Sequence, residues 1–135
     1  MANALYDKGR EGFLDGSIDW DTNNIKLVLI DEADDTIDLA NDDNLDDRVL
    51  ASRVATSGNL ASKTVTNGIA DAADVTLSAV TGDVSESIDI YKDSGVESTS
   101  RLICNIDTAT GLPVTPNGGD ITVQFDGGAN KIFKL

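Results

Sequence analysis

The fold is decided by two stretches, Arg101-Leu102-Ile103-Cys104-Asn105-Ile106-Asp107 and Asp120-Ile121-Thr122-Val123-Gln124-Phe125-Asp126. In both, apolar and polar residues alternate, which is the period of a β-strand with one buried face. Together with nearby apolar runs they predict successive strands of one antiparallel meander: Ile88–Lys92, Arg101–Asp107, Leu112–Thr115, Ile121–Phe125 and Lys131–Leu135. Glycine and asparagine in residues 126–130 favour a tight turn. We therefore expect the last two strands of the meander to form a hairpin.

The earlier part of the chain also favours strands. Residues 24–31 are the most apolar stretch of the sequence, so we expect a short central strand that is buried on both faces. Between residues 53 and 80, threonine-rich alternating runs are separated by turn signals about ten residues apart, a spacing typical of sandwiches and barrels. The sequence therefore predicts a mainly β protein, a single antiparallel β-sandwich or barrel-like domain with a short N-terminal helical arm.

The arm is predicted over residues 1–16 and the all-β domain over residues 17–135. Apolar and charged residues between positions 3 and 15 follow helical spacing. Glycines at 9, 12 and 16 weaken an isolated helix by about 1 kcal/mol each, so the helix needs a surface on which to dock. We expect another chain to provide that surface, with the arm becoming ordered on binding. The candidate protein-interaction residues are Leu5, Tyr6, Phe13, Leu14 and Trp20.

Charge is distributed unevenly along the chain. The formal net charge is −14, which argues against direct binding to a nucleic-acid backbone. Residues 31–47 contain nine acidic residues and no basic one, so we expect an acidic excursion that is solvated or faces a basic partner. As an alternative, oxygen atoms of this segment and of Asp19 and Asp21 could coordinate calcium, but their spacing does not match an EF-hand loop. The main expectation is that the protein binds no metal and no cofactor. The calcium candidates within the segment are Asp42, Asp43, Asp46 and Asp47.

Catalytic signatures are missing from the sequence. It contains no histidine, which removes the most common general base, and no nucleophile elbow, phosphate loop or dinucleotide-binding turn. A hydrolytic enzyme with a pair of carboxylates stays open as an alternative, although the few aromatic residues do not favour a sugar-binding cleft. Cys104 is the sole cysteine, and we expect it to be a small packing residue on the strand face opposite Ile103.

The sequence also bears on location. No run approaches the ~20 apolar residues of a membrane helix, which predicts a soluble protein without a membrane partner. Residues 1–8 lack a basic segment followed by an apolar one, so we expect synthesis in a cytoplasm without a classical signal peptide.

Four segments of the chain, Met1–Glu11, Arg53–Leu60, Lys63–Thr76 and Asp107–Asp120, resemble a family of small tailed-bacteriophage proteins. The segment Asp34–Asp47 departs most from that family, because it is more acidic and less aromatic. The resemblance implies a virion structural protein of the capsid decoration or cement type, made in the bacterial host and located on the capsid surface. It implies the major capsid protein and further copies of this chain as partners, and it carries over no catalytic residue. A tail or host-surface component that binds carbohydrate stays open as the alternative function.

Overall fold

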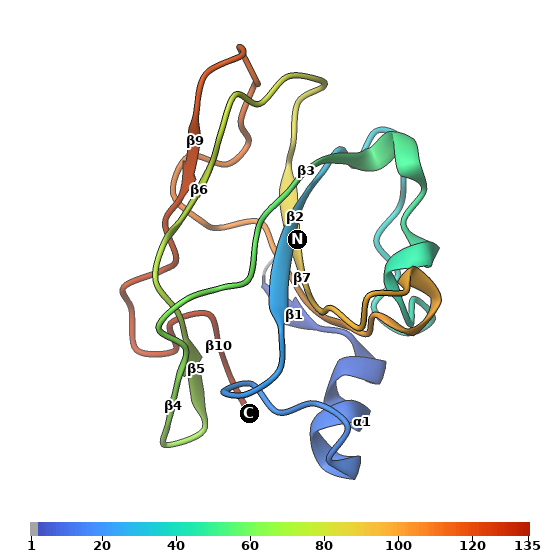
Figure 1. Ribbon diagram of the computed structural model, residues 1–135, viewed down its shortest axis with the longest axis vertical. Coiled ribbons are helices and arrows are strands. Elements are labelled where there is room, and N and C mark those ends of the chain that lie inside the picture. The colour runs from blue at the N-terminus through green and yellow to red at the C-terminus, as the bar shows by residue number, and fades with distance from the viewer. Residues whose placement is uncertain (1–2) are drawn as a thin grey trace.

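The computed structural model describes residues 3–135, and its elements are mostly short antiparallel strands (Figure 1). The strands are β1 (Ala4–Leu5), β2 (Ile25–Ile30), β3 (Arg53–Thr56), β4 (Thr64–Thr66), β5 (Ile69–Asp71), β6 (Val75–Leu77), β7 (Ser87–Lys92), β8 (Leu102–Ile106), β9 (Ile121–Val123) and β10 (Phe133–Lys134). The helices are α1 (Asp7–Asp15) and the 3-10 turns η1 (Leu45–Asp47), η2 (Leu50–Ser52) and η3 (Glu97–Thr99). No helix in residues 3–135 has the length and apolar character needed to cross a bilayer.

Within the described chain, five strands form the main sheet in the order β1-β8-β7-β2-β3, and every neighbouring pair is antiparallel. The apolar strand β2 pairs with β7 on one side and β3 on the other, and nearly all of its side chains are buried. The prediction of a central buried strand at residues 24–31 is confirmed.

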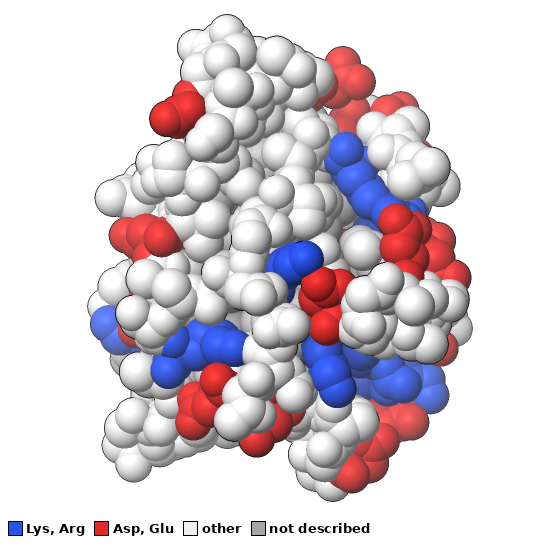
Figure 2. Space-filling model, in the orientation of Figure 1, with Lys and Arg blue, Asp and Glu red and all other residues white. Residues whose placement is uncertain are grey.

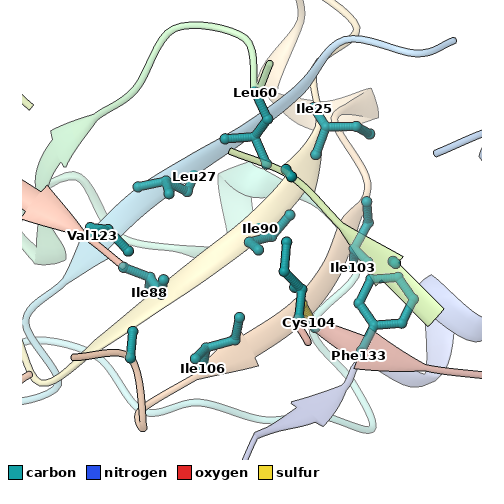
Figure 3. Close-up of a cluster of buried hydrophobic side chains, with 14 of the residues drawn as sticks. Ile25, Leu27, Leu60, Ile88, Ile90, Ile103, Cys104, Ile106, Val123 and Phe133 are labelled. Carbon is teal, nitrogen blue, oxygen red and sulfur yellow. The ribbon is translucent and has the colours of Figure 1, made fainter. Parts of the chain in front are cut away.

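A second layer covers one face of the main sheet. It consists of the sheets β10-β5-β4 and β6-β9, which Figure 1 shows to the left of β2 and β7. Alternate side chains of the main sheet, such as Leu27, Ile88 and Ile90, meet Val123 and Phe133 from this layer in a common core (Figure 3). The predicted fold class, a mainly β sandwich-like domain with a helix near the N-terminus, is confirmed.

The predicted meander is wrong beyond its first two strands. β7 and β8 pair as expected, but β9 pairs with β6 and β10 pairs with β5, so residues 121–125 and 131–135 do not form a hairpin. In residues 112–115, Val114 makes an isolated bridge to Ser85 instead of lying in a longer strand. The turn-forming residues do interrupt the strands, as predicted. However, β9 and β10 pair with strands that lie about 45 to 65 residues earlier in the chain.

An irregularity in β8 changes which residues share a face. The register between β7 and β8 shifts between Ile90 and Tyr91, where Ile90 lies opposite Cys104 and Tyr91 lies opposite Leu102. The additional residue, Ile103, then packs in the same core as Cys104. Cys104 is buried, as predicted, but its expected position on the face opposite Ile103 is wrong.

The other face of the main sheet is covered by residues 31–50, which we call the acidic strap. Leu45 is buried in a second apolar cluster with Val28 and Ile30, and Ile37 and Leu39 pack against that cluster. The strap therefore folds onto the sheet, and the prediction of a solvated excursion is wrong for this segment as a whole. Its apolar side chains secure the strap, while four of its nine acidic residues are exposed, four are partly buried and Asp31 is buried.

Candidate protein-interaction surface

An apolar surface lies where α1 approaches the C-terminal strand β10, two elements that Figure 1 shows in the lower part of the molecule. It consists of Phe13, Leu14, Val65 and Leu135, and we call it the terminal patch. Leu14 is 89% exposed, Leu135 61% and Val65 54%. Two hollows of about 340 and about 360 Å³ adjoin one another here, and Phe13 and Leu135 line both. A contiguous exposed apolar surface of this kind is typical of an interaction site.

Two glycines let α1 pack closely on its own chain, Gly9 on the main sheet and Gly12 on the loop after the helix, and so position Leu14. A Cβ atom at Gly9 would lie 2.6 Å from the carbonyl oxygen of Ile103, and one at Gly12 would lie 2.5 Å from Cδ1 of Ile18. Because the obstacle at Gly9 is backbone, only glycine lets α1 lie this close to β8, whereas Gly12 packs against the side chain of Ile18. Leu14 points to solvent. The glycines that weaken an isolated helix are thus the residues that dock it on its own chain.

The floor of the terminal patch is aromatic. The ring of Phe133 packs edge to face against Trp20, with centroids 5.4 Å apart, and packs at a tilt of 49° against Phe13, with centroids 5.6 Å apart. The indole nitrogen of Trp20 donates a hydrogen bond to the carbonyl oxygen of Asp71 at 3.0 Å. These contacts join α1, β5 and β10 into a firm support, so the patch is presented by packed elements.

The predicted interaction residues divide into two groups. Leu5, Tyr6 and Trp20 are buried within the protein's own fold, so the prediction that they contact a partner is corrected. Leu5 lies in β1, which pairs with β8, and this pairing ties the predicted arm to the sheet in the described residues. Phe13 is half-buried and Leu14 exposed, and these two come together in the terminal patch. Residues 1 and 2 of the predicted arm lie outside the described residues.

Charged side chains surround the terminal patch unequally. Arg10 and Lys134 line the hollow on the Leu14 side, whereas Asp19 lines the other hollow. Arg10 forms an exposed ion pair with Asp7 at 3.2 Å and donates a hydrogen bond to the carbonyl oxygen of Leu5 at 3.0 Å. Figure 2 shows basic and acidic side chains mixed along the lower part of this view. The rim beside Leu14 therefore carries charges of both signs, because Asp7 pairs with Arg10 and the acidic residues Glu11 and Asp15 of α1 are also exposed.

A cluster of polar side chains is buried beneath the acidic strap. The hydroxyl of Tyr6 donates a hydrogen bond to Oδ1 of Asp89 at 2.7 Å. The side-chain amide of Asn105 donates to the same oxygen at 3.0 Å and to Oγ of Ser87 at 3.0 Å. Alternation along β7 explains the arrangement, because Ile88 and Ile90 face the apolar core while Ser87 and Asp89 face the strap.

Arg48 connects this cluster to the acidic strap. Its guanidinium is fully buried, forms an ion pair with Asp42 and lies 3.6 Å from carboxylate oxygens of Asp35 and Asp89. It also donates a hydrogen bond to the carbonyl oxygen of Thr36 at 3.2 Å. The strap is thus folded around a cation that the chain supplies itself, which is why part of its carboxylates need no external partner.

Burial determines the protonation chemistry of the cluster. Desolvation raises the pKa of Asp89 to about 6, although hydrogen bonds from Tyr6 and Asn105 and the charge of Arg48 act in the opposite direction. Burial raises the pKa of Tyr6, with the Asp89 charge adding to the effect, and burial also raises the pKa of the Cys104 thiol. Asp89, Arg48 and Asn105 have no exposed surface, so a substrate cannot reach them. The cluster therefore holds the strap in place.

Two of the calcium candidates, Asp42 and Asp47, are engaged by the protein's own donors. Oδ2 of Asp47 accepts hydrogen bonds from the backbone amides of Asp43 at 2.6 Å and Asn44 at 3.1 Å, which caps η1. A different trio, Asp31, Asp34 and Asp83, brings carboxylate oxygens within 4.8 Å of one another. Sequence spacing does not reveal this trio, because Asp83 is distant in the chain. An acidic cluster without other ligands is common at protein surfaces.

Comparison with known proteins gives no assignment: no protein-family model matches the chain, and no curated protein matches it either. The case for function therefore depends on the geometry of the terminal patch and on the sequence. Val65, Phe133 and Leu135 were missed as components of this surface, because they are distant from Leu14 in the chain. Arg48 was missed as the centre of the strap, although its position directly after nine acidic residues was a usable signal.

Proposed function

We propose that the protein is a non-enzymatic structural protein of a tailed-bacteriophage virion, which binds the head shell and stabilises it. The observation that carries the proposal is the terminal patch, in which Leu14 is almost fully exposed beside the half-buried Phe13. A shell-binding protein needs a preformed contact surface and no catalytic group. The terminal patch supplies such a surface on a helix that is already docked.

The energetics suit a role that depends on many copies. Burying a leucine side chain contributes about 1.5–3 kcal/mol, so a contact through Leu14 and its neighbours is modest for one molecule. On a lattice, many such contacts act together, and the apparent affinity rises steeply through multivalency. A small patch is therefore sufficient for a decoration protein, whereas it would be weak for a solitary binding protein.

The surface charge supports an assembly that depends on salt. The acidic strap contributes nine carboxylates, and its one cation, Arg48, is buried. Exposed ion pairs with a basic partner are screened as ionic strength rises. We expect attachment to weaken between about 0.05 M and about 0.5 M salt, because the Debye length falls to a few ångströms over that range.

The alternative, a tail or host-surface component that binds carbohydrate, required exposed aromatic platforms. Trp20 and Tyr91 are the aromatic residues to examine for that role. Both are buried, so they offer no ring face on which a sugar could stack. The observation favours the shell-binding proposal over this alternative.

A sedimentation experiment tests the proposal. Shells assembled from the major capsid protein of the source phage are mixed with the wild-type protein, the Leu14→Asp variant or the control Val84→Asp, which alters an exposed valine outside the terminal patch. Wild type and control should co-sediment with shells in hundreds of copies, and Leu14→Asp should require at least tenfold higher concentration. Failure of the wild-type protein to co-sediment would refute the proposal.

A further inference from the structure

Two asparagine–glycine pairs lie in exposed turns of the chain, and their surroundings differ. Asn67 and Gly68 form the turn between β4 and β5, whereas Asn117 and Gly118 lie in the segment before β9. An asparagine that precedes glycine is chemically labile, because glycine has no side chain to keep its amide nitrogen away from the asparagine carboxamide. The environment of each pair therefore decides which of the two reacts.

The turn between β4 and β5 leaves the reacting groups free. Its backbone has positive φ at both residues, 54° at Asn67 and 78° at Gly68, as in a tight hairpin turn. Both residues are exposed, and so are the three residues of β4. Within residues 3–135, neither the carboxamide of Asn67 nor the amide N–H of Gly68 takes part in a hydrogen bond. A solvated tip of this kind opens locally at little cost.

At Asn117 the fold holds the same groups in place. The amide N–H of Gly118 donates a hydrogen bond to the carbonyl oxygen of Val80 at 2.8 Å, and the amide of Val80 donates to the carbonyl oxygen of Gly119 at 2.9 Å. Oδ1 of Asn117 accepts a hydrogen bond from the amide of Gly119 at 2.9 Å. Val80 is buried, so these bonds tie the turn to the core. Attack by the nitrogen of Gly118 requires the turn to open first.

We propose that Asn67 is a site of spontaneous deamidation and that the fold protects Asn117 from the same reaction. The amide nitrogen of Gly68 loses its proton to solvent hydroxide and attacks Cγ of Asn67. A bond from that nitrogen to Cγ forms, the bond from Cγ to Nδ2 breaks, and ammonia leaves with a proton from water. Water then opens the cyclic imide at one of its two carbonyl carbons, which gives aspartate or isoaspartate.

The modification changes the tip of the hairpin in charge and in chain length. Either product replaces a neutral carboxamide with a carboxylate, and isoaspartate also carries the backbone through the former side chain, which lengthens the turn. The carbonyl oxygen of Gly68 accepts a hydrogen bond from the amide of Leu135 at 2.9 Å. A longer turn displaces this oxygen, so isoaspartate at position 67 loosens the contact between the hairpin and Leu135. The inference does not depend on the proposed function.

Peptide mapping by mass spectrometry tests the inference with the full-length protein. Samples are kept at mildly alkaline pH in native buffer and in concentrated urea, and aliquots are digested with trypsin over time. Asn67 is the one asparagine in residues 64–92, and fragment spectra locate Asn117 within residues 102–131. In urea the two pairs should react at similar rates. In the native protein Asn67 should react at least about fivefold faster than Asn117, the factor expected when one ordinary hydrogen bond must break first.

A variant and a second measurement complete the test. Asn67→Gly suits the positive φ of the turn and should remove the modified form of residues 64–92. Hydrogen exchange should be faster at the amide of Gly68 than at that of Gly118. Equal rates at the two asparagines in the native protein, or faster reaction at Asn117, would overturn the inference. A native Asn67 that stays unmodified while the urea sample reacts there, or an amide of Gly118 that exchanges as fast as that of Gly68, would also overturn it.

Discussion

Replacing Asp89 by asparagine is predicted to make the free energy of unfolding less dependent on pH between mildly acidic and neutral conditions. Asp89 is fully buried beneath the acidic strap, and burial raises its pKa from 3.8 to about 6. The folded protein therefore holds this proton up to about pH 6, whereas the unfolded chain releases it near 3.8. The stabilising contribution of the proton is complete below the lower value and is lost as pH rises through the upper one.

The size of the effect follows from the two pKa values. Their difference corresponds to about 3 kcal/mol of unfolding free energy, of which about 2 kcal/mol falls between about pH 4.5 and about pH 7.5. In Asp89→Asn the side-chain oxygen can still accept the hydrogen bond from Tyr6, but the residue no longer titrates. The unfolding free energy of the variant should therefore change less with pH than that of the wild type, by about 2 kcal/mol over this window.

Urea titrations followed by the fluorescence of the buried Trp20 measure these free energies at each pH. Subtraction of the wild-type and variant curves removes the contributions of other carboxyl groups, such as Asp15, Asp38 and Asp93, whose pKa values are lowered by hydrogen bonds. Asp46→Asn, at an exposed site, is the matched control. If the curve of Asp89→Asn runs parallel to that of the wild type, the assignment of the buried proton to Asp89 is wrong.

Three further perturbations test the packing and the strap. Gly9→Ala should destabilise the protein by about 1–3 kcal/mol, because the new Cβ would meet the backbone of Ile103. The control Gly58→Ala, at a position with open space around it, should change the urea midpoint little. Equal midpoints for the two variants would contradict the close docking of α1. Arg48→Met should destabilise the protein by about 3–5 kcal/mol, since it leaves the surrounding carboxylates buried without their cation. An unchanged melting temperature would contradict the role of Arg48 in holding the acidic strap. Adding calcium or a chelator should leave the melting temperature unchanged, and a clear rise with calcium would identify a cation site among the strap carboxylates.

The strands that alternate strongly could be predicted from the sequence, but their partners could not. Local periodicity identifies β7 and β8, and the apolar run at residues 24–31 identifies β2, because burial on a sheet face requires those residue types. The pairing of β9 with β6 and of β10 with β5 depends on contacts between segments distant in the chain. A turn signal marks where a strand ends and says little about which strand comes next to it.

The interaction residues selected from the sequence differ in exposure for a similar reason. Hydrophobicity selected Phe13 and Leu14, which stay at least partly exposed, but the same criterion selected Tyr6 and Trp20, which the protein buries in its own fold. Gly9 was interpreted by its effect on an isolated helix, and its effect on helix docking became visible only with β8 in place. Likewise, the density of acids suggested a solvated excursion, because charge counting does not reveal that Arg48 is enclosed by them.

The central claim, that the protein stabilises a phage head shell through the terminal patch, is tested most directly by heating shells in a calorimeter. Bare shells are compared with shells saturated with the wild-type protein, with Leu14→Asp or with Val84→Asp. The account predicts a higher melting temperature for shells with the wild type and with Val84→Asp, and a melting temperature near that of bare shells with Leu14→Asp at the same concentration. Equal melting of bare shells and shells saturated with the wild-type protein would contradict the claim.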